Sequence, residues 1–250
     1  MSKINYYLKR PIELGAISLG KTFYGKPKID QYLDIRIKRE FGLLEIAAVI
    51  VPNHCIGADG MILKTIINKP IHFLIQKEGV YDSKLKSLLW LIGEIPVGMD
   101  NRSTYKQAIR RAGDYLRWSN DYIGIFSEGP TKSLVKGDEA ISLEQREHKT
   151  GAAHIAIDNE VPIIPVGLYV NEKVQRYLWS FDKGVDAAWA YLEDHVSKEG
   201  KLPYHVNIGY PVYPEYFNKL PKKQRVKEIT KVVKERIIGL VNEIKEEYNK

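Results

Sequence analysis

The residues of this chain most able to do chemistry are a histidine and an aspartate five positions apart, His54 and Asp59. A neutral imidazole is a usable base near pH 7 when its tautomer and orientation are fixed, and a carboxylate on one ring N–H can fix both. The pair could therefore remove a proton from a hydroxyl group. A structural role stays open at each position, because lone histidines are often simply packed and Asp59 could cap a helix that follows it.

Further polar residues follow predicted strands at three places in the chain. Asn53 follows one strand, Arg102 follows another, and Glu128 with Gly129 follows a third. A guanidinium such as that of Arg102 suits bidentate binding of phosphate, and a glycine permits close approach of a ligand or a turn with positive φ. Lys132 adds positive charge nearby. Taken singly, each charged side chain is more ordinarily interpreted as a solvated loop residue.

The elements that must position these residues alternate between apolar strands and amphipathic helices. Strands are predicted over residues 44–51, 71–75, 95–99, 122–126, 161–170 and 204–208, and helices over residues 60–68, 83–91, 104–118 and 148–159. Such alternation indicates a single α/β domain with a mostly parallel sheet flanked by helices. Ligands of such sheets lie beyond the carboxyl ends of the strands, where the polar residues are placed. Pro162 and Pro165 predict an edge strand or an irregular ladder for residues 161–170.

Three segments are expected along the chain. Residues 1–40 form a polar, helical N-terminal segment, residues 41–215 the α/β domain and residues 216–250 an amphipathic C-terminal helix. The polar face of that helix mixes both charge signs, so packing on the sheet is favoured, with rest on a lipid surface as the alternative. Its apolar residues at helical spacing are Val226, Ile229, Val233, Ile237, Leu240, Val241, Ile244 and Tyr248.

Composition limits the partners and the compartment. The 250 residues carry a formal net charge of +7, which favours phosphorylated metabolites, anionic lipid headgroups or nucleic acid as partners, although a lysine-rich surface can simply keep a protein soluble. Cys55 is the single cysteine, so an internal disulfide is excluded and a reducing cytoplasm is expected. No signal pattern and no apolar run of about 18 residues are found, so no membrane crossing is expected.

Other chemistries are disfavoured by the pattern. Cys55 beside His54 suggests a Cys–His nucleophile, but adjacent residues in an extended chain point to opposite sides. The histidines are scattered without the spacing of metal ligands, so no metal is expected. The chain also lacks a GxxxxGK[ST] element and a Gly-rich dinucleotide loop.

In their order along the chain, these motifs resemble the glycerophospholipid acyltransferases, and most of all the lysophosphatidate acyltransferases. The resemblance runs from about residue 47 to residue 169. It is carried by Asn53-His54 with Asp59, by Ile95-Pro96-Val97 with Arg102, by Phe126-Ser127-Glu128-Gly129, by Lys149-Thr150-Gly151 and by residues 161–166.

The resemblance implies a role for each matching residue. His54 would be the general base, oriented by Asp59, and the deprotonated hydroxyl would attack an acyl thioester directly, without an acyl-enzyme. The thioester would be acyl-CoA or acyl-carrier protein, and no metal or bound cofactor would take part. The acceptor, a lysophospholipid or another phosphorylated compound, would be bound by five residues: Asn53, Arg102, Glu128, Gly129 and Lys132.

The third block departs from the family pattern Phe-Pro-Glu-Gly-Thr-Arg-Ser. Ser127 replaces the proline, Pro130 is additional, and Lys132 stands where arginine is expected. Because lysine is a point charge rather than a planar fork, these departures concern the phosphate of the acceptor.

These features together predict a cytoplasmic O-acyltransferase acting on a glycerophosphate-type acceptor, lysophosphatidate above all. Peripheral contact with an anionic membrane at its inner face is expected, and nucleic acid is not expected as a partner. Two rival hypotheses are a basic protein that binds nucleic acid or an anionic surface, favoured by the net charge and by Arg110-Arg111, and a catalytically silent relative that binds lipid.

Overall fold

A seven-stranded sheet forms the framework of the residues that the computed structural model describes, which are 34–37, 46–55, 59–67, 69–77, 86–98, 102–129, 135–136, 139–170 and 204–248. The strands in order across this sheet are β1 (Asp34–Ile37), β9 (Tyr204–Ile208), β8 (Ile163–Val170), β2 (Ala48–Pro52), β5 (Tyr122–Gly124), β3 (Ile71–Gln76) and β4 (Ile95–Val97). A separate antiparallel pair comprises β6 (Val135–Lys136) and β7 (Glu139–Ala140).

Parallel pairing dominates the large sheet, because only β8 and β9 pair antiparallel among its described strands. β2 lies between β8 and β5, and all five of its residues are buried. A strand rich in valine and isoleucine and covered on both faces is typical of a parallel sheet. The predicted α/β fold is therefore confirmed, and each strand predicted from the sequence is present.

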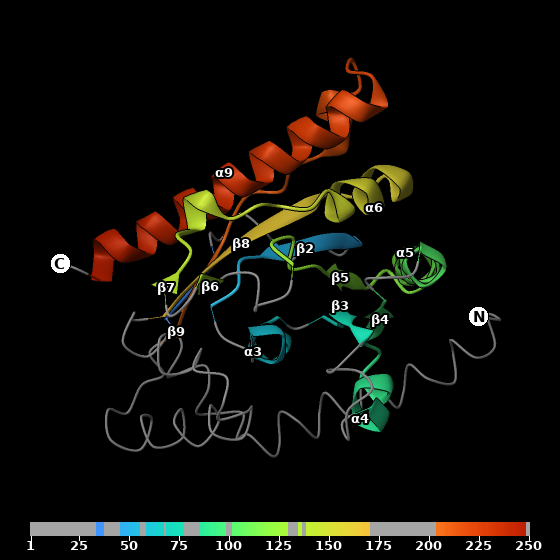
Figure 1. Cartoon of the computed structure of the whole chain (residues 1–250), viewed down its shortest axis with the longest axis horizontal. Helices are drawn as coiled ribbons and strands as arrows, with labels where there is room; N and C mark the ends of the chain where they lie inside the picture. Colours follow the sequence, from blue (N-terminus) through green and yellow to red (C-terminus); the bar gives the residue numbers. More distant parts are fainter. Residues whose placement is uncertain are drawn as a thin grey trace.

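Helices cover both faces of the sheet. One hydrophobic core joins Val49 and Val51 of β2 to α5 (Arg102–Trp118), α6 (Gly151–Asn159) and α9 (Lys222–Tyr248). The other joins Ala48 and Ile50 to α3 (Asp59–Ile66), since successive side chains of a strand point to opposite faces. Figure 1 shows α9 above β8, and α3 with α4 (Lys86–Leu91) below the sheet. Two 3-10 turns, η3 (Leu143–Gln145) and η5 (Pro214–Phe217), flank α6 and α9.

The C-terminal helix α9 packs on β8 and comes close to it at Gly167. A β-carbon at that position would lie 2.6 Å from Leu240 Cβ and 3.0 Å from Val241 N, so α9 can approach because residue 167 has no side chain. No helix within the described ranges is long and apolar enough to span a bilayer. The buried apolar residues of α9 are Val226, Ile229, Val233, Ile237, Leu240, Val241 and Ile244.

β8 lies inside the sheet, so its interpretation as an edge strand was wrong. Pro165 pairs in register with Val51 of β2, and its carbonyl accepts the Gly209 N–H at 2.9 Å. The nitrogen and carbonyl of one strand residue point to the same side, so the donor that Pro165 lacks faces the end of β9 rather than β2. The ladder with β2 therefore loses no hydrogen bond.

Two boundaries bear on the site. α6 begins at Gly151 rather than at residue 148, which leaves His148 and Lys149 in the loop before it. Glu160 caps the C-terminus of α6 with a left-handed φ of 54°, and α5 is likewise followed by Asn120 with a φ of 58°. Within the predicted N-terminal segment the structure describes β1 alone, and the rest of residues 1–40 lies outside the described residues.

Candidate active site

His54 and Asp59 meet at the carboxyl edge of the sheet. His54 follows the end of β2 by two residues, and Asp59 begins α3. The His54 Nδ1 atom lies 3.0 Å from Asp59 Oδ2. The Asp59 side chain is fully buried, whereas 15% of the His54 side chain is exposed. A histidine whose Nδ1 faces a carboxylate keeps Nε2 for chemistry, and its partial exposure gives a substrate access to the ring.

Two further donors hold the Asp59 carboxylate. The Cys55 N–H donates to Oδ2 at 2.9 Å, and the Tyr204 hydroxyl donates to Oδ1 at 2.6 Å. Burial, and then the charge of Asp59, raise the pKa of Tyr204 well above its ordinary value, so the phenol stays protonated. Tyr204 is the first residue of β9, which runs antiparallel to β8 and so starts at the edge where the parallel strands end.

An aromatic stack supports the His54 ring. The imidazole lies on Phe126 with ring centroids 3.8 Å apart and planes 8° apart. Phe126 in turn stacks on Phe73, at a centroid distance of 5.4 Å. A β-carbon on Gly124 would overlap the Phe73 ring, so β5 needs glycine at this position. Packing thus fixes the plane of the imidazole, while Asp59 fixes its rotation.

The backbone of His54 is held on both sides. Its N–H donates to Glu128 Oε2 at 2.9 Å, and its carbonyl accepts from Arg146 Nη1 at 3.0 Å. The same nitrogen of Arg146 lies 3.1 Å from Glu128 Oε2, and both side chains are buried. Burial raises the pKa of the Glu128 carboxyl, and the nearby guanidinium opposes that shift. These contacts favour support of the His54 backbone as the role of Glu128.

The loop before α6 also contacts the third block through Ser127. Its Oγ lies 2.7 Å from His148 Nδ1, and its carbonyl accepts the Lys149 N–H at 2.7 Å. Burial lowers the pKa of His148 to about 4, and the charges of Lys234 and Arg146 act in the same direction. The imidazole is therefore neutral near pH 7, and its Nδ1 can accept the Ser127 hydroxyl. Ser127, which stands where the resemblance predicts proline, ties its loop to a second loop.

Asn53 and Cys55 join the end of β2 to β8. The Asn53 Nδ2 donates to the Leu168 carbonyl at 2.9 Å, and its Oδ1 accepts the Leu168 N–H at 2.7 Å. The Cys55 thiol donates to the same carbonyl at 2.9 Å, and burial raises its pKa well above the ordinary value. These contacts favour support of the loop for Asn53 and packing, rather than nucleophilic chemistry, for Cys55.

The remaining residues predicted for the site are placed to different extents. Gly129 follows Glu128 with a φ of 87°, in the turn expected of it. Arg102 is the first residue of α5, but its side chain lies outside the described part of the structure. Lys132 lies outside the described residues altogether. The structure therefore brings five of the seven predicted residues together around the end of β2.

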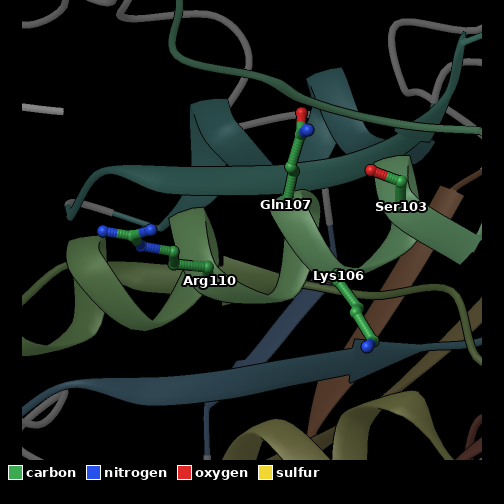
Figure 2. Close-up of a pocket in the computed structure, with 4 residues that line it drawn as sticks. All are labelled: Ser103, Lys106, Gln107 and Arg110. Atoms are coloured by element: carbon green, nitrogen blue, oxygen red, sulfur yellow. The ribbon is translucent and has the colours of Figure 1, made fainter.

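A hollow of about 440 Å³ runs along α5, and none of the contacts of His54 described above lies in it. The lining residues are Ser103, Lys106, Gln107 and Arg110. Figure 2 shows Lys106 pointing to the other side of the helix from Gln107, and away from Arg110, so the two cations do not converge. Across the ranges that the structure describes, no three His, Cys, Asp or Glu side chains come together as a metal site.

Comparison with known proteins relates this site to a family. A family model described as Acyltransferase matches residues 27–169, more than half of the chain. The chain belongs to the acyltransferase family. The matched segment contains both members of the His54–Asp59 pair and the third block, so the family resemblance drawn from the order of the motifs is confirmed.

Among solved structures, this acyltransferase is similar to the 1-acyl-sn-glycerophosphate (LPA) acyltransferase PlsC from Thermotoga maritima. The TM-score is 0.55 at 16% sequence identity, over 96% of this chain and 83% of that chain. At this identity the likeness concerns the fold. A search among curated proteins found no match.

Three residues that complete the site of this acyltransferase are not singled out by the sequence. The sequence predicts Tyr204 only as a strand residue, Arg146 as a loop residue and His148 as the first residue of a helix. One signal does exist, because Lys149 belongs to a block that resembles the family pattern. The position of Arg146 and His148 just before that block is therefore the signal in the sequence that could indicate a support of the site.

Proposed function

We propose that this acyltransferase moves a fatty acyl group from acyl-CoA or acyl-carrier protein to the hydroxyl of a glycerophosphate-type acceptor, most simply lysophosphatidate. The observation that carries the proposal is the 3.0 Å contact of His54 Nδ1 with Asp59, on a ring that is partly exposed at the carboxyl edge of the sheet. The protein with the similar fold is named as an LPA acyltransferase, which supports the same class of acceptor.

The reaction follows from the geometry of the pair. With Nδ1–H donating to Asp59, His54 Nε2 takes the proton of the acceptor hydroxyl. The oxygen attacks the thioester carbonyl, the C–O bond forms, and the C–S bond breaks. The proton on His54 then passes to the departing sulfur, which leaves as a free thiol. The Asp59 carboxylate stabilises the imidazolium, and the proposed steps use no metal or bound cofactor.

We assign the phosphate of the acceptor to Arg102 and Lys132, as the family resemblance implies. Arg102 opens α5, and the N-terminus of a helix favours an anion through its unpaired N–H groups. Lys132 belongs to the same proposed phosphate site. The net charge of +7 further supports peripheral contact with an anionic membrane, where such acceptors reside.

Release of free thiol from acyl-CoA tests this function. The purified protein should release thiol when lysophosphatidate is supplied, and H54A should lower kcat about 10³-fold, the scale of a lost general base. H154A, in α6, is the matched histidine control and should leave kcat unchanged. Glycerol 3-phosphate and a choline-bearing lysophospholipid, offered in parallel, rank the acceptors. Normal turnover by H54A would contradict the role of His54 as general base. Absence of thiol release with every acceptor would contradict the proposed function.

A further inference from the structure

Arg146 is a buried cation, and in the proposed reaction it is not an acid, a base or a nucleophile. It lies in the loop between η3 and α6, and 6% of the residue is exposed. Its Nη1 lies 3.0 Å from the His54 carbonyl and 3.1 Å and 3.3 Å from the two oxygens of Glu128. Its Nε donates to the Ile141 carbonyl at 3.0 Å. A buried guanidinium is stable only with partners of this kind, so its geometry is tightly specified.

The ion pair of Arg146 with Glu128 encloses the backbone of His54. Glu128 accepts the His54 N–H, Arg146 donates to the His54 carbonyl, and the two side chains bind each other. A change in the φ or ψ angle of His54 therefore breaks a charge-assisted hydrogen bond, which is stronger than a neutral one. Asp59 and Phe126 orient the ring relative to this backbone, so the ring is placed only as well as the backbone is.

The C-terminal helix holds the loop that carries Arg146. Lys234 of α9 donates to the Arg146 carbonyl at 2.9 Å and to the Glu144 carbonyl at 2.7 Å. Its neighbours Val233 and Ile237 are buried in the core under α9. A continuous set of contacts thus runs from α9 through the loop and the ion pair to the base.

We propose that Arg146 is a positioning residue for acyl transfer, and that it sets the place of His54 through the His54 backbone while Lys234 holds Arg146 in register. The inference rests on the proposed function, because it assigns Arg146 to the reaction that depends on His54. A base displaced by about 1 Å loses on the order of 10² in rate, although the acceptor still binds.

Kinetics of Arg146 variants test the inference. In R146M, kcat for thiol release should fall about 30- to 100-fold while KM for lysophosphatidate changes less than about 2-fold, because the base moves and the acceptor contacts do not. R146K should be intermediate, since its ammonium restores charge to Glu128 but is one atom shorter and loses the bond to Ile141. R117M removes an exposed arginine paired with Asp114 and should leave both constants unchanged.

Two more variants separate positioning from folding. R146M leaves the Glu128 carboxylate buried without its cation, so R146M/E128Q is made beside it to remove that charge. The double variant should fold, as judged by its thermal melt, and should still show the low kcat because the His54 carbonyl lacks its donor. K234M removes the two hydrogen bonds by which α9 holds the loop, and its kcat should fall about 3- to 10-fold at unchanged KM.

The outcomes divide cleanly. A wild-type kcat in R146M or in R146M/E128Q overturns the inference, and so does a raised KM at unchanged kcat, which marks contact with the acceptor. If the wild-type protein releases thiol and H54A does not, the proposed function stands whatever Arg146 does. If the wild-type protein releases no thiol with any acceptor, the proposed function falls and the inference falls with it.

Discussion

The hydroxyl of Tyr204 donates to the buried carboxylate of Asp59. Removal of that hydroxyl tests whether Asp59 depends on this hydrogen bond. Y204F keeps the ring and removes the 2.6 Å bond to Asp59 Oδ1. A buried acceptor that loses its donor costs about 1–3 kcal/mol, so the free energy of unfolding should fall by about that amount. We also expect kcat to fall about 10-fold, because the carboxylate orients His54 less firmly.

Urea unfolding and thiol release measure the two effects of Y204F. Y216F is the control, since Tyr216 is 75% exposed and its hydroxyl is already solvated. Equal stability and equal kcat in Y204F and the wild-type protein would show that Asp59 does not depend on the phenol.

The lowered pKa of His148 predicts that the stability of the protein depends on pH. Its pKa is lowered to about 4 in the folded protein by burial, with Lys234 and Arg146 adding to the shift, and the Glu128 carboxylate lies 3.9 Å away. Between about pH 6.5 and pH 4 the unfolded chain therefore takes up a proton that the folded chain does not, and stability falls as the pH falls. H148N keeps an acceptor for Ser127 and cannot titrate, so its stability should fall less over this window.

Urea unfolding of both proteins at pH 7, 6, 5 and 4.5 measures this difference, and H154N serves as the control exchange. Parallel loss of stability in the wild-type protein and in H148N would contradict the assignment.

Residue types and short spacings are enough to single out His54, Asp59 and Glu128 as candidates, because each follows a strand end that the apolar pattern predicts. Their partners Arg146 and Tyr204 are not predictable in this way. Arg146 lies 92 residues along the sequence from His54, and Tyr204 lies 145 residues from Asp59. A separation of that length in the sequence does not by itself predict a contact. Their roles depend on which strands are neighbours, and in particular on β9 running antiparallel beside β8.

At the level of elements, the contact of α9 with β8 depends on the absence of a side chain at Gly167. G167A would push a β-carbon against the backbone of α9, at 3.0 Å from Val241 N. Backbone cannot rotate away as a side chain can, so we expect the free energy of unfolding to fall by about 1–3 kcal/mol. G239A, in the same helix and with nothing within 4 Å, should raise it by about 0.5–1 kcal/mol.

Denaturant unfolding of the two glycine variants gives opposite signs if the close contact is as described. A stabilised G167A would mean that α9 lies farther from the sheet.

The apolar periodicity predicts the strands and the amphipathic C-terminal helix well, because burial on one or two faces is what the pattern reports. It is less informative about neighbours. The prolines of residues 161–170 favoured an edge, yet Pro165 fits inside the sheet because its nitrogen faces the end of β9. The pattern also predicts that α6 starts at residue 148, whereas the helix begins at Gly151. His148 is therefore a loop residue, and it contacts Ser127.

For the molecule as a whole, the net charge of +7 predicts electrostatic binding to an anionic lipid surface. Vesicles that contain phosphatidylglycerol should bind the protein in low salt, and about 0.5 M salt should release it, because screening shortens the reach of the charge. Vesicles of phosphatidylcholine alone should bind little. Flotation of the vesicles measures bound protein, and equal binding to both kinds, insensitive to salt, would exclude an electrostatic attachment.

The contact between Tyr204 and Asp59 also determines when, during synthesis of the chain, the site can be completed. The ribosome makes His54 and Asp59 before the phenol of Tyr204 in β9 and before Lys234 in α9. Contacts between residues so far apart in the sequence form late in folding. A nascent chain therefore carries His54 and Asp59 over 145 residues of synthesis before the phenol that binds Asp59 is made, and we expect the proposed acyl transfer only after β9 and α9 have emerged.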